Sequence, residues 1–324
     1  MSLIVLAIAA SLATGGPPAD TTRGEVRPDS VRSSALGVPK RLLVYLPPSY
    51  HREPARRYPV AYYLHGAWGA EGDWVTQGRI DRAMDSLVGG GLPEMILVLP
   101  DGDDGWYTTW NALNNTATCR ADTARREPAA TYCVPWPKYD EYIARELVAH
   151  IDSTYRTVAR RDHRGIAGLS MGGYGAVTLA LRYPEVFAAA ASHSGVLSPR
   201  YVGPTPYAPP TRYAPSVDAA RGRYSPALWA LMLPAFGRDT VGWHARDPAI
   251  YARKLVVSRA KPPALLIDVG RDDPFLEQNR AFRADVSALG IPMRYAEWPG
   301  KHDWVYWRTH VVESLVWMAG VIGR

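Results

Sequence analysis

Residues 165–175 read Gly-Ile-Ala-Gly-Leu-Ser-Met-Gly-Gly-Tyr-Gly, and this stretch decides the fold. At its centre Ser170 lies between Gly168 and Gly172, in a G-x-S-x-G pattern that follows a predicted strand and opens a predicted helix. That setting is typical of a nucleophile elbow, in which the serine occupies a sharp turn with its hydroxyl exposed. Glycine is needed at both flanking positions because strand and helix approach each other closely there. The alternative is a glycine-rich helix start with an ordinary capping serine.

Continuous apolar runs recur on both sides of this motif and predict strands that are covered on both faces, as in a parallel sheet. Segments with helical periodicity lie between them. The alternation predicts a doubly wound α/β sheet whose ligand site lies beyond the carboxyl ends of the strands. The predicted strands are 58–64, 95–99, 165–169, 186–191, 264–269 and 293–298, after a β-region at 31–46, and the predicted helices are 139–155, 172–183, 275–289 and 304–321.

Two segments, 111–137 and 197–242, do not fit the alternation, and we interpret both as lid-like insertions over the sheet edge of a single domain spanning 17–324. The first insertion contains Cys119 and Cys133. In an exported protein these cysteines could form one disulfide, contributing about 3 kcal/mol if it is unstrained. A zinc site is less favoured, because two cysteines without a histidine cluster do not complete a tetrahedral shell.

Residues 1–16 predict a signal peptide, because an apolar run at 3–12 ends in small residues. No Lys or Arg precedes this run, and a buried N-terminal strand is the alternative. We therefore expect a secreted or periplasmic protein. The run is about half the length needed to cross a bilayer, and no later run is long enough to span one, so stable membrane insertion is not expected.

The composition is that of a folded protein. The 324 residues are 47% hydrophobic and 21% charged, which argues against a disordered or coiled-coil chain. Lysine accounts for five of the 37 basic residues, and the arginines are scattered. Nucleic-acid binders concentrate positive charge in a run or on one face, so we expect no nucleic-acid partner.

A serine hydroxyl becomes a strong nucleophile only when a base removes its proton, and a carboxylate must orient that base. Of the eight histidines, His302 is favoured because it lies between the last predicted strand and the final helix. His193 also follows a strand and is the main competitor, but we see no natural place for a carboxylate beside it. His65 and His163 lie at less suitable positions.

The predicted acid is Asp273, which follows the penultimate strand, and its neighbour Asp272 could substitute. Asp268 is still within the strand. Asp273 could instead be only a helix cap before Pro274. The chain order Ser, Asp, His is the order found in α/β-hydrolases.

The oxyanion of an ester intermediate needs backbone N–H donors, which we assign to Ala67 and Met171. Trp106 and Tyr107 follow another strand end and are predicted to wall the substrate site, although loop packing is equally expected of them.

Residues 101–105 are similar to the start of a calcium loop. The twelfth position from Asp101 is Ala112, where a glutamate is needed, so no metal is assigned.

Several motifs together resemble the esterase D-like family of α/β-hydrolases, which includes S-formylglutathione hydrolases, feruloyl and acetyl esterases and mycolyltransferases. The resemblance runs from about residue 33 to the C-terminus and implies Asp273 rather than Asp272 as the acid. The matching segments are 44–50 (VYLPPSY), 58–66 (YPVAYYLHG), 99–102 (LPDG), 142–156 (YIARELVAHIDSTYR), 168–176 (GLSMGGYGA), 247–255 (DPAIYARKL), 270–276 (GRDDPFL) and 300–308 (GKHDWVYWR). The two insertions do not match the family pattern.

These observations predict a secreted serine esterase with the triad Ser170, Asp273 and His302, which needs no cofactor. Its expected substrate is a small-molecule or glycan-linked ester with a short acyl, acetyl or feruloyl group, contacted by Trp68 and Trp304 as well as the two walling aromatics. One alternative is acyl transfer to a sugar hydroxyl, as in mycolyltransferases. Another is a carbohydrate-binding relative with no activity.

Overall fold

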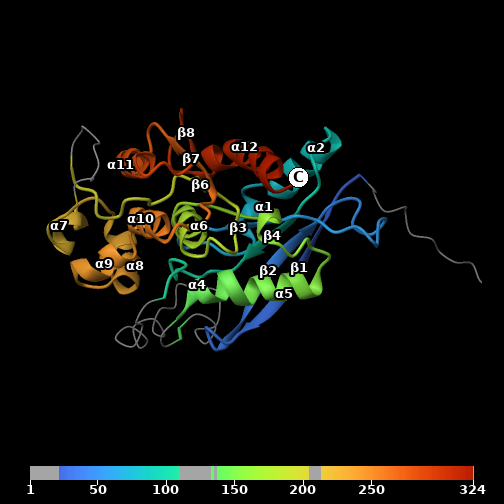
Figure 1. Ribbon diagram of the computed structural model, residues 1–324, viewed down its shortest axis with the longest axis horizontal. Helices are drawn as coiled ribbons and strands as arrows, with labels where there is room; N and C mark the ends of the chain where they lie inside the picture. The colour runs from blue at the N-terminus through green and yellow to red at the C-terminus, as the bar shows by residue number, and fades with distance from the viewer. Residues whose placement is uncertain (1–21, 110–132, 135–136, 204–212, 324) are drawn as a thin grey trace, which may run out of the picture.

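One mixed eight-stranded sheet organises the computed structural model, which describes residues 22–109, 133–134, 137–203 and 213–323 (Figure 1). The strand order is β1-β2-β4-β3-β5-β6-β7-β8. Strands β3 to β8 run parallel, whereas β2 is antiparallel to both of its neighbours. The strands are β1 (Glu25–Ser33), β2 (Val38–Leu46), β3 (Val60–Leu64), β4 (Ile96–Pro100), β5 (Arg164–Leu169), β6 (Ala189–His193), β7 (Ala264–Gly270) and β8 (Met293–Trp298).

Helices cover both faces of the sheet, because its central strands are apolar on both sides. In β3, Val60, Tyr62 and Leu64 belong to one buried cluster, and Ala61 and Tyr63 belong to the other. The first cluster is completed by η2 (Tyr142–Leu147), α5 (Val148–Thr154), α6 (Met171–Arg182), α10 (Pro248–Ser258) and α11 (Leu276–Ala288). The second is completed by α1 (Asp73–Thr76), α2 (Ile80–Gly89) and α12 (Trp304–Ile322). The predicted α/β architecture is therefore confirmed.

Most predicted elements are present, with shifted boundaries. The strand predicted at 186–191 begins at Ala189, and the β-region at 31–46 is an antiparallel hairpin of β1 and β2. The helix predicted at 139–155 is divided into α4 (Tyr139–Glu141), a π-helical segment η2, and α5. A short 3-10 helix, η3 (Arg161–His163), precedes β5.

The described part of the predicted insertion at 197–242 is about half helical. It contains α7 (Val217–Arg221), α8 (Pro226–Phe236) and the start of α9 (Thr240–Ala245). Each helix has a capping side chain that accepts a backbone N–H: Ser216, Ser225 and Asp239, respectively. These caps, with Pro226 at the start of α8, are sequence signals for helices that the abundance of proline and tyrosine concealed.

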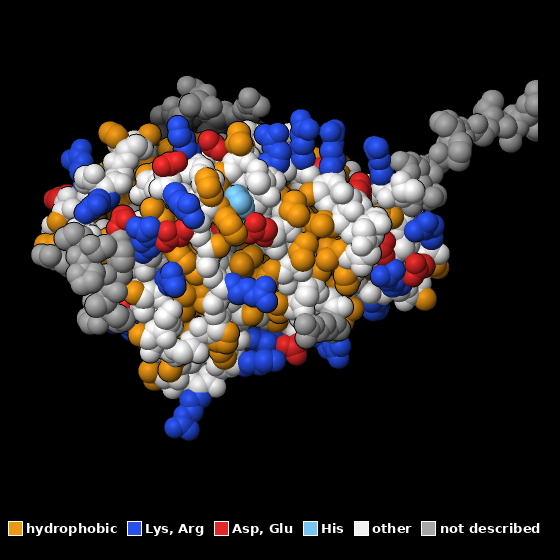
Figure 2. Space-filling view, turned by 90° about the horizontal axis from the view of Figure 1, so that it is seen from above, with side chains coloured by type: hydrophobic (Ala, Val, Ile, Leu, Met, Phe, Trp, Pro, Cys, Tyr) orange, Lys and Arg blue, Asp and Glu red, His pale blue; other side chains and the backbone are white. Residues whose placement is uncertain are grey.

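Several sequence expectations fall on parts of the chain that the structure does not describe. Residues 1–16 and Cys119 lie outside the described residues. Cys133 is disulfide-bonded. None of the helices in the described ranges combines the length and hydropathy needed to cross a membrane. On the face shown in Figure 2, Lys and Arg side chains are interspersed with hydrophobic and acidic ones.

Candidate active site

Ser170 lies at the junction of β5 and α6, in a backbone conformation that few residues with side chains adopt. Its φ is 52° and its ψ is −116°. A Cβ at position 168 would lie 2.4 Å from the carbonyl carbon of Gly172, and one at 172 would lie 2.3 Å from the carbonyl oxygen of Leu64. The flanking glycines are therefore required by close approach of strand, loop and helix, as the sequence pattern indicates. The Ser170 side chain makes no capping hydrogen bond, which contradicts the ordinary-cap interpretation.

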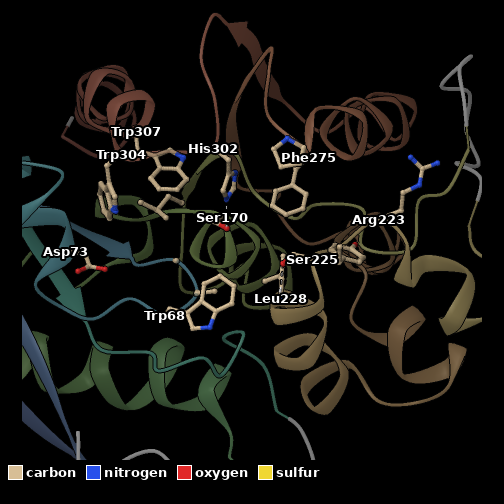
Figure 3. Close-up of a pocket in the computed structure, with 15 residues that line it drawn as sticks. Trp68, Asp73, Ser170, Arg223, Ser225, Leu228, Phe275, His302, Trp304 and Trp307 are labelled. Carbon is tan, nitrogen blue, oxygen red and sulfur yellow. Dashed lines mark hydrogen bonds between the residues drawn. The ribbon is translucent and has the colours of Figure 1, made fainter. Parts of the chain in front are cut away.

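The structure brings Ser170, His302 and Asp273 into one hydrogen-bonded chain (Figure 3). His302 Nε2 lies 3.0 Å from Ser170 Oγ, and His302 Nδ1 lies 2.8 Å from Asp273 Oδ2. The second oxygen of Asp273 accepts the N–H of Phe275 at 2.8 Å, so this carboxylate also stabilises the turn before α11. Asp272 is exposed, and its N–H donates to Gly300 O instead.

Two aromatic rings flank the imidazole of His302. The rings of Phe275 and Trp307 lie 5.0 and 4.9 Å from it, both nearly perpendicular to its plane. The imidazole side chain keeps 23% of its surface exposed, whereas the Asp273 side chain is fully buried. Water therefore reaches the imidazole but not the carboxylate that orients it. The sequence analysis named neither aromatic residue, although Trp307 lies one helical turn into α12.

The loop after β3 brings Ala67 to the same pocket as Ser170. A Cβ at Gly66 would lie 2.6 Å from Leu169 Cδ1, so this loop packs directly against the end of β5. Met171 is the first residue of α6, and the first N–H groups of a helix have no partner within it. The backbone amides of Ala67 and Met171 are therefore candidate donors to an oxyanion bound beside Ser170.

A buried ion cluster braces that loop. The Lys40 ammonium lies 2.8 Å from Asp101 Oδ2 and 2.7 Å from Asp103 Oδ2, at 1% exposure of its side chain. Burial disfavours its charged form, but Asp103 and Asp101 raise the pKa of Lys40 overall. The segment similar to a calcium loop thus binds an internal ammonium group. The adjacent Asp104 accepts the N–H of Trp68, which connects this cluster to the loop that carries Ala67.

A second buried network lies behind the three site residues, and the sequence analysis missed it. His193 and Asp268 are paired in β6 and β7, with His193 Nδ1 2.7 Å from Asp268 Oδ2. The expectation that His193 has no neighbouring carboxylate was therefore wrong. His193 Nε2 lies 2.9 Å from Ser314 Oγ, and Tyr306 donates its hydroxyl to Asp268 Oδ1 at 2.9 Å. His193 and Asp268 are both buried, and His302 is the histidine that reaches Ser170.

This network is connected to each of the three segments that carry the site. The N–H of Ser170 donates to the carbonyl oxygen of His193 at 2.9 Å. Asp268 belongs to β7, the strand that leads to Asp273. The Tyr306 ring packs against the loop before His302, because a Cβ at Gly300 would lie 2.6 Å from Tyr306 Cδ2.

A cavity of about 340 Å³ opens above Ser170 and His302. Its walls are largely aromatic and aliphatic, and they come from the loop after β3, from α8, and from the starts of α11 and α12 (Figure 3). Leu228 lines the cavity from α8, so the second insertion helps to shape the pocket, together with Trp68, Phe275, Trp304 and Trp307.

The four aromatic residues expected to contact substrate divide into two pairs. Trp68, which is 62% exposed, and Trp304 line the cavity. Trp106 and Tyr107 do not, because both are fully buried. Trp106 packs against Tyr174 with ring centroids 5.6 Å apart, and the Tyr107 hydroxyl donates to His65 O. Their assignment to the substrate site is corrected to loop packing.

Comparisons with known proteins agree with this architecture. A sequence model of the Esterase family matches residues 33–318. An esterase of Mycobacterium tuberculosis is 30% identical over 284 residues, which are 84% of this chain and 54% of the relative. The chain therefore spans about half the length of this curated relative. The acetyl esterase of Caldicellulosiruptor saccharolyticus is 24% identical over 260 residues, which are 80% of this chain and 83% of the relative.

A solved ferulic acid esterase has a similar structure, with a TM-score of 0.67 and 25% sequence identity, covering 92% of this chain and 99% of that one. Its likeness and the mostly parallel sheet show the α/β-hydrolase fold. Because the family match includes most of the chain, the protein is a member of the Esterase family.

Proposed function

We propose that the protein is a serine-dependent carboxylic ester hydrolase that acts through an acyl-enzyme. The observation that carries the proposal is the hydrogen-bonded chain from Ser170 Oγ through the His302 ring to Asp273, with contacts of 3.0 and 2.8 Å. His302 would remove the hydroxyl proton as Ser170 attacks the ester carbonyl, while Asp273 holds the ring in the required orientation. No cofactor is required for this chemistry.

The N–H groups of Ala67 and Met171 would stabilise the tetrahedral oxyanion. Collapse of this intermediate breaks the ester bond, and His302 transfers its proton to the departing alkoxide. A water molecule, deprotonated by the same imidazole, then attacks the acyl-enzyme and releases the acid and the serine hydroxyl. The aromatic cavity walls support esters with short acyl or aromatic groups as substrates. Two of the similar proteins are named for esters of these kinds, an acetyl esterase and a ferulic acid esterase.

The direct test is hydrolysis of p-nitrophenyl esters by single-site variants. We expect Ser170→Ala to abolish turnover. Asp273→Asn should lower kcat about 10⁴-fold, because an asparagine favours the wrong imidazole tautomer. Asp272→Asn is the matched control, since Asp272 is exposed and lies one position away. Unchanged hydrolysis by Ser170→Ala, or equal losses for the two asparagine variants, would contradict the proposal.

The same assay addresses the two alternatives. Transfer to a sugar would appear as an acylated product when trehalose or another sugar acceptor is added. A binding protein without activity would bind sugar tightly with no turnover of acetyl, butyryl or feruloyl esters by the wild type.

We also propose that the protein is exported. The apolar segment at residues 3–12, followed by small residues, and the disulfide-bonded state of Cys133 support this location. Cell fractionation tests the location, and recovery of the protein in the cytoplasmic fraction alone would contradict export. N-terminal sequencing of the exported protein tests cleavage separately.

A further inference from the structure

The cavity above Ser170 has residues of opposite charge at its two ends. Apart from His302, the charged residues among the described cavity-lining positions are Asp73 and Arg223. Figure 3 shows Asp73 on the same side of Ser170 as Trp304, and Arg223 on the other side, beyond Phe275. The reacting groups therefore lie between an acidic end and a basic end.

Arg223 is held at the basic end by its backbone and by a neighbouring side chain. It lies in the turn between α7 and α8, where its N–H donates to Ala220 O at 3.0 Å. The next residue, Tyr224, is buried and donates its hydroxyl to Pro199 O at 2.6 Å. Gln278 donates to the same hydroxyl from α11. The turn is thus tied to the body of the protein, which restricts the position of the arginine.

The guanidinium of Arg223 retains capacity for a ligand. It donates one hydrogen bond, to Val202 O at 2.7 Å, and no carboxylate in the described residues forms an ion pair with it. A guanidinium has five N–H donors, so most of those of Arg223 have no protein partner in the described residues, at the outer end of the cavity. The walls between Arg223 and Ser170 include Leu228 and Phe275, so the path from the reacting groups to the arginine is apolar.

Asp73 makes the opposite end unfavourable for an anion. Its Oδ2 accepts the N–H of Ala70 at 3.3 Å, and no cation in the described ranges pairs with it. A negatively charged substrate group is therefore repelled at this end and attracted at the other.

We propose that the pocket selects esters that carry an anionic group, such as a carboxylate, and binds that group beside Arg223. The uncharged part of the substrate then occupies the side lined by Trp304 and Asp73. This inference rests on the proposed hydrolase function and names the substrate class for the same site. Arg223 acts as a specificity residue, because a guanidinium forms charge-assisted, often bidentate, hydrogen bonds with carboxylates.

Two matched ester pairs test the inference. In the first, p-nitrophenyl valerate and mono-p-nitrophenyl glutarate have acyl chains of equal carbon number, and only the second acyl group is anionic. In the second, 4-carbamoylphenyl acetate and 4-carboxyphenyl acetate differ by a charge on the leaving group. We expect the wild type to show higher kcat/KM for the anionic member of one pair. That pair identifies which half of the ester faces Arg223.

In that pair, Arg223→Gln should reduce the anionic-to-neutral ratio of kcat/KM about tenfold, and Arg223→Lys should restore part of it. The ratio should also decrease with added NaCl, because the guanidinium is exposed. Arg221→Gln is the matched control, since Arg221 is exposed and lies outside the cavity lining. A wild-type ratio near one in both pairs, or a ratio that Arg223→Gln leaves unchanged, would overturn the inference and leave the hydrolase proposal standing. Absence of turnover for all four esters by the folded wild type would instead refute the proposed function, and the inference with it.

Discussion

Replacing Tyr306 with phenylalanine tests whether the buried network positions the catalytic groups. The hydroxyl lies 2.9 Å from Asp268 Oδ1, and burial together with this carboxylate raises the pKa of Tyr306, so the group stays protonated and donates. Its loss leaves a buried carboxylate oxygen short of a donor, at a cost of about 2 kcal/mol in the free energy of unfolding. The hydroxyl's hydrogen bond to Asp268 holds the ring in place against Gly300, two positions before His302, so its loss should let the ring and this loop shift, and we expect kcat to fall about tenfold. A misplacement of about 1 Å can cost up to 100-fold.

The assay separates this positioning effect from general destabilisation. We expect Tyr306→Phe to lower kcat with little change in KM, and to slow labelling of Ser170 by a fluorophosphonate. Tyr63→Phe is the matched control, because the Tyr63 hydroxyl is also buried and lies 3.2 Å from Ser314 Oγ in the same network. That change should cost about 1 kcal/mol in urea denaturation and leave kcat within twofold. The reasoning is refuted if Tyr306→Phe loses stability and keeps wild-type kcat, or if the two variants lose kcat equally.

Two further predictions concern buried charges. Lys40→Met leaves Asp101 and Asp103 buried without their cation, so we expect the free energy of unfolding to fall by about 3–5 kcal/mol in urea titrations. Lys261→Met removes an exposed ion pair and should cost less than about 1 kcal/mol, and equal losses would contradict the argument. Burial raises the pKa of Asp247 to about 7, above the unfolded value of 3.8, so its stabilising protonation is lost as the pH rises through 7. The free energy of unfolding of Asp247→Asn should therefore rise relative to that of the wild type between pH 5 and pH 8. A difference between the two that does not change with pH would refute the raised pKa of Asp247.

The parts of the site that depend on local chain geometry could be predicted from the sequence. Gly168 and Gly172 mark a place where only hydrogen fits, and such a requirement is visible as two glycines around one serine. The order of strands and helices then places the ends of β7 and β8 at the same edge of the sheet as Ser170. His302 follows from that order because it lies between the last strand and the last helix.

The pocket walls could not be predicted in the same way, because they depend on which side chains turn outward from their loops. Trp106 and Trp68 both follow strand ends and both have positive φ, yet one is fully buried and the other is 62% exposed. The difference arises from packing with distant elements, since Trp106 contacts Phe236 of α8 at 5.2 Å. No spacing in the sequence indicates that contact. A prediction of α8 from its Ser225 cap would have identified this part of the predicted insertion as a helix.

The choice between Asp273 and Asp272 shows where residue chemistry alone is insufficient. The two carboxylates are chemically identical and adjacent, so a sequence pattern without a known family leaves both open. In the structure the turn leaves Asp272 exposed and buries Asp273. The N–H of Asp272 donates to Gly300 O, which joins the acid loop to the histidine loop and leaves its own side chain in solvent. The next residue consequently points inward, where one oxygen of Asp273 accepts the Phe275 amide and the other meets His302. The exposed aspartate thus contributes through its backbone, and this contact predicts that Asp272→Asn preserves the site whereas Asp272→Pro, which lacks the N–H, disrupts it.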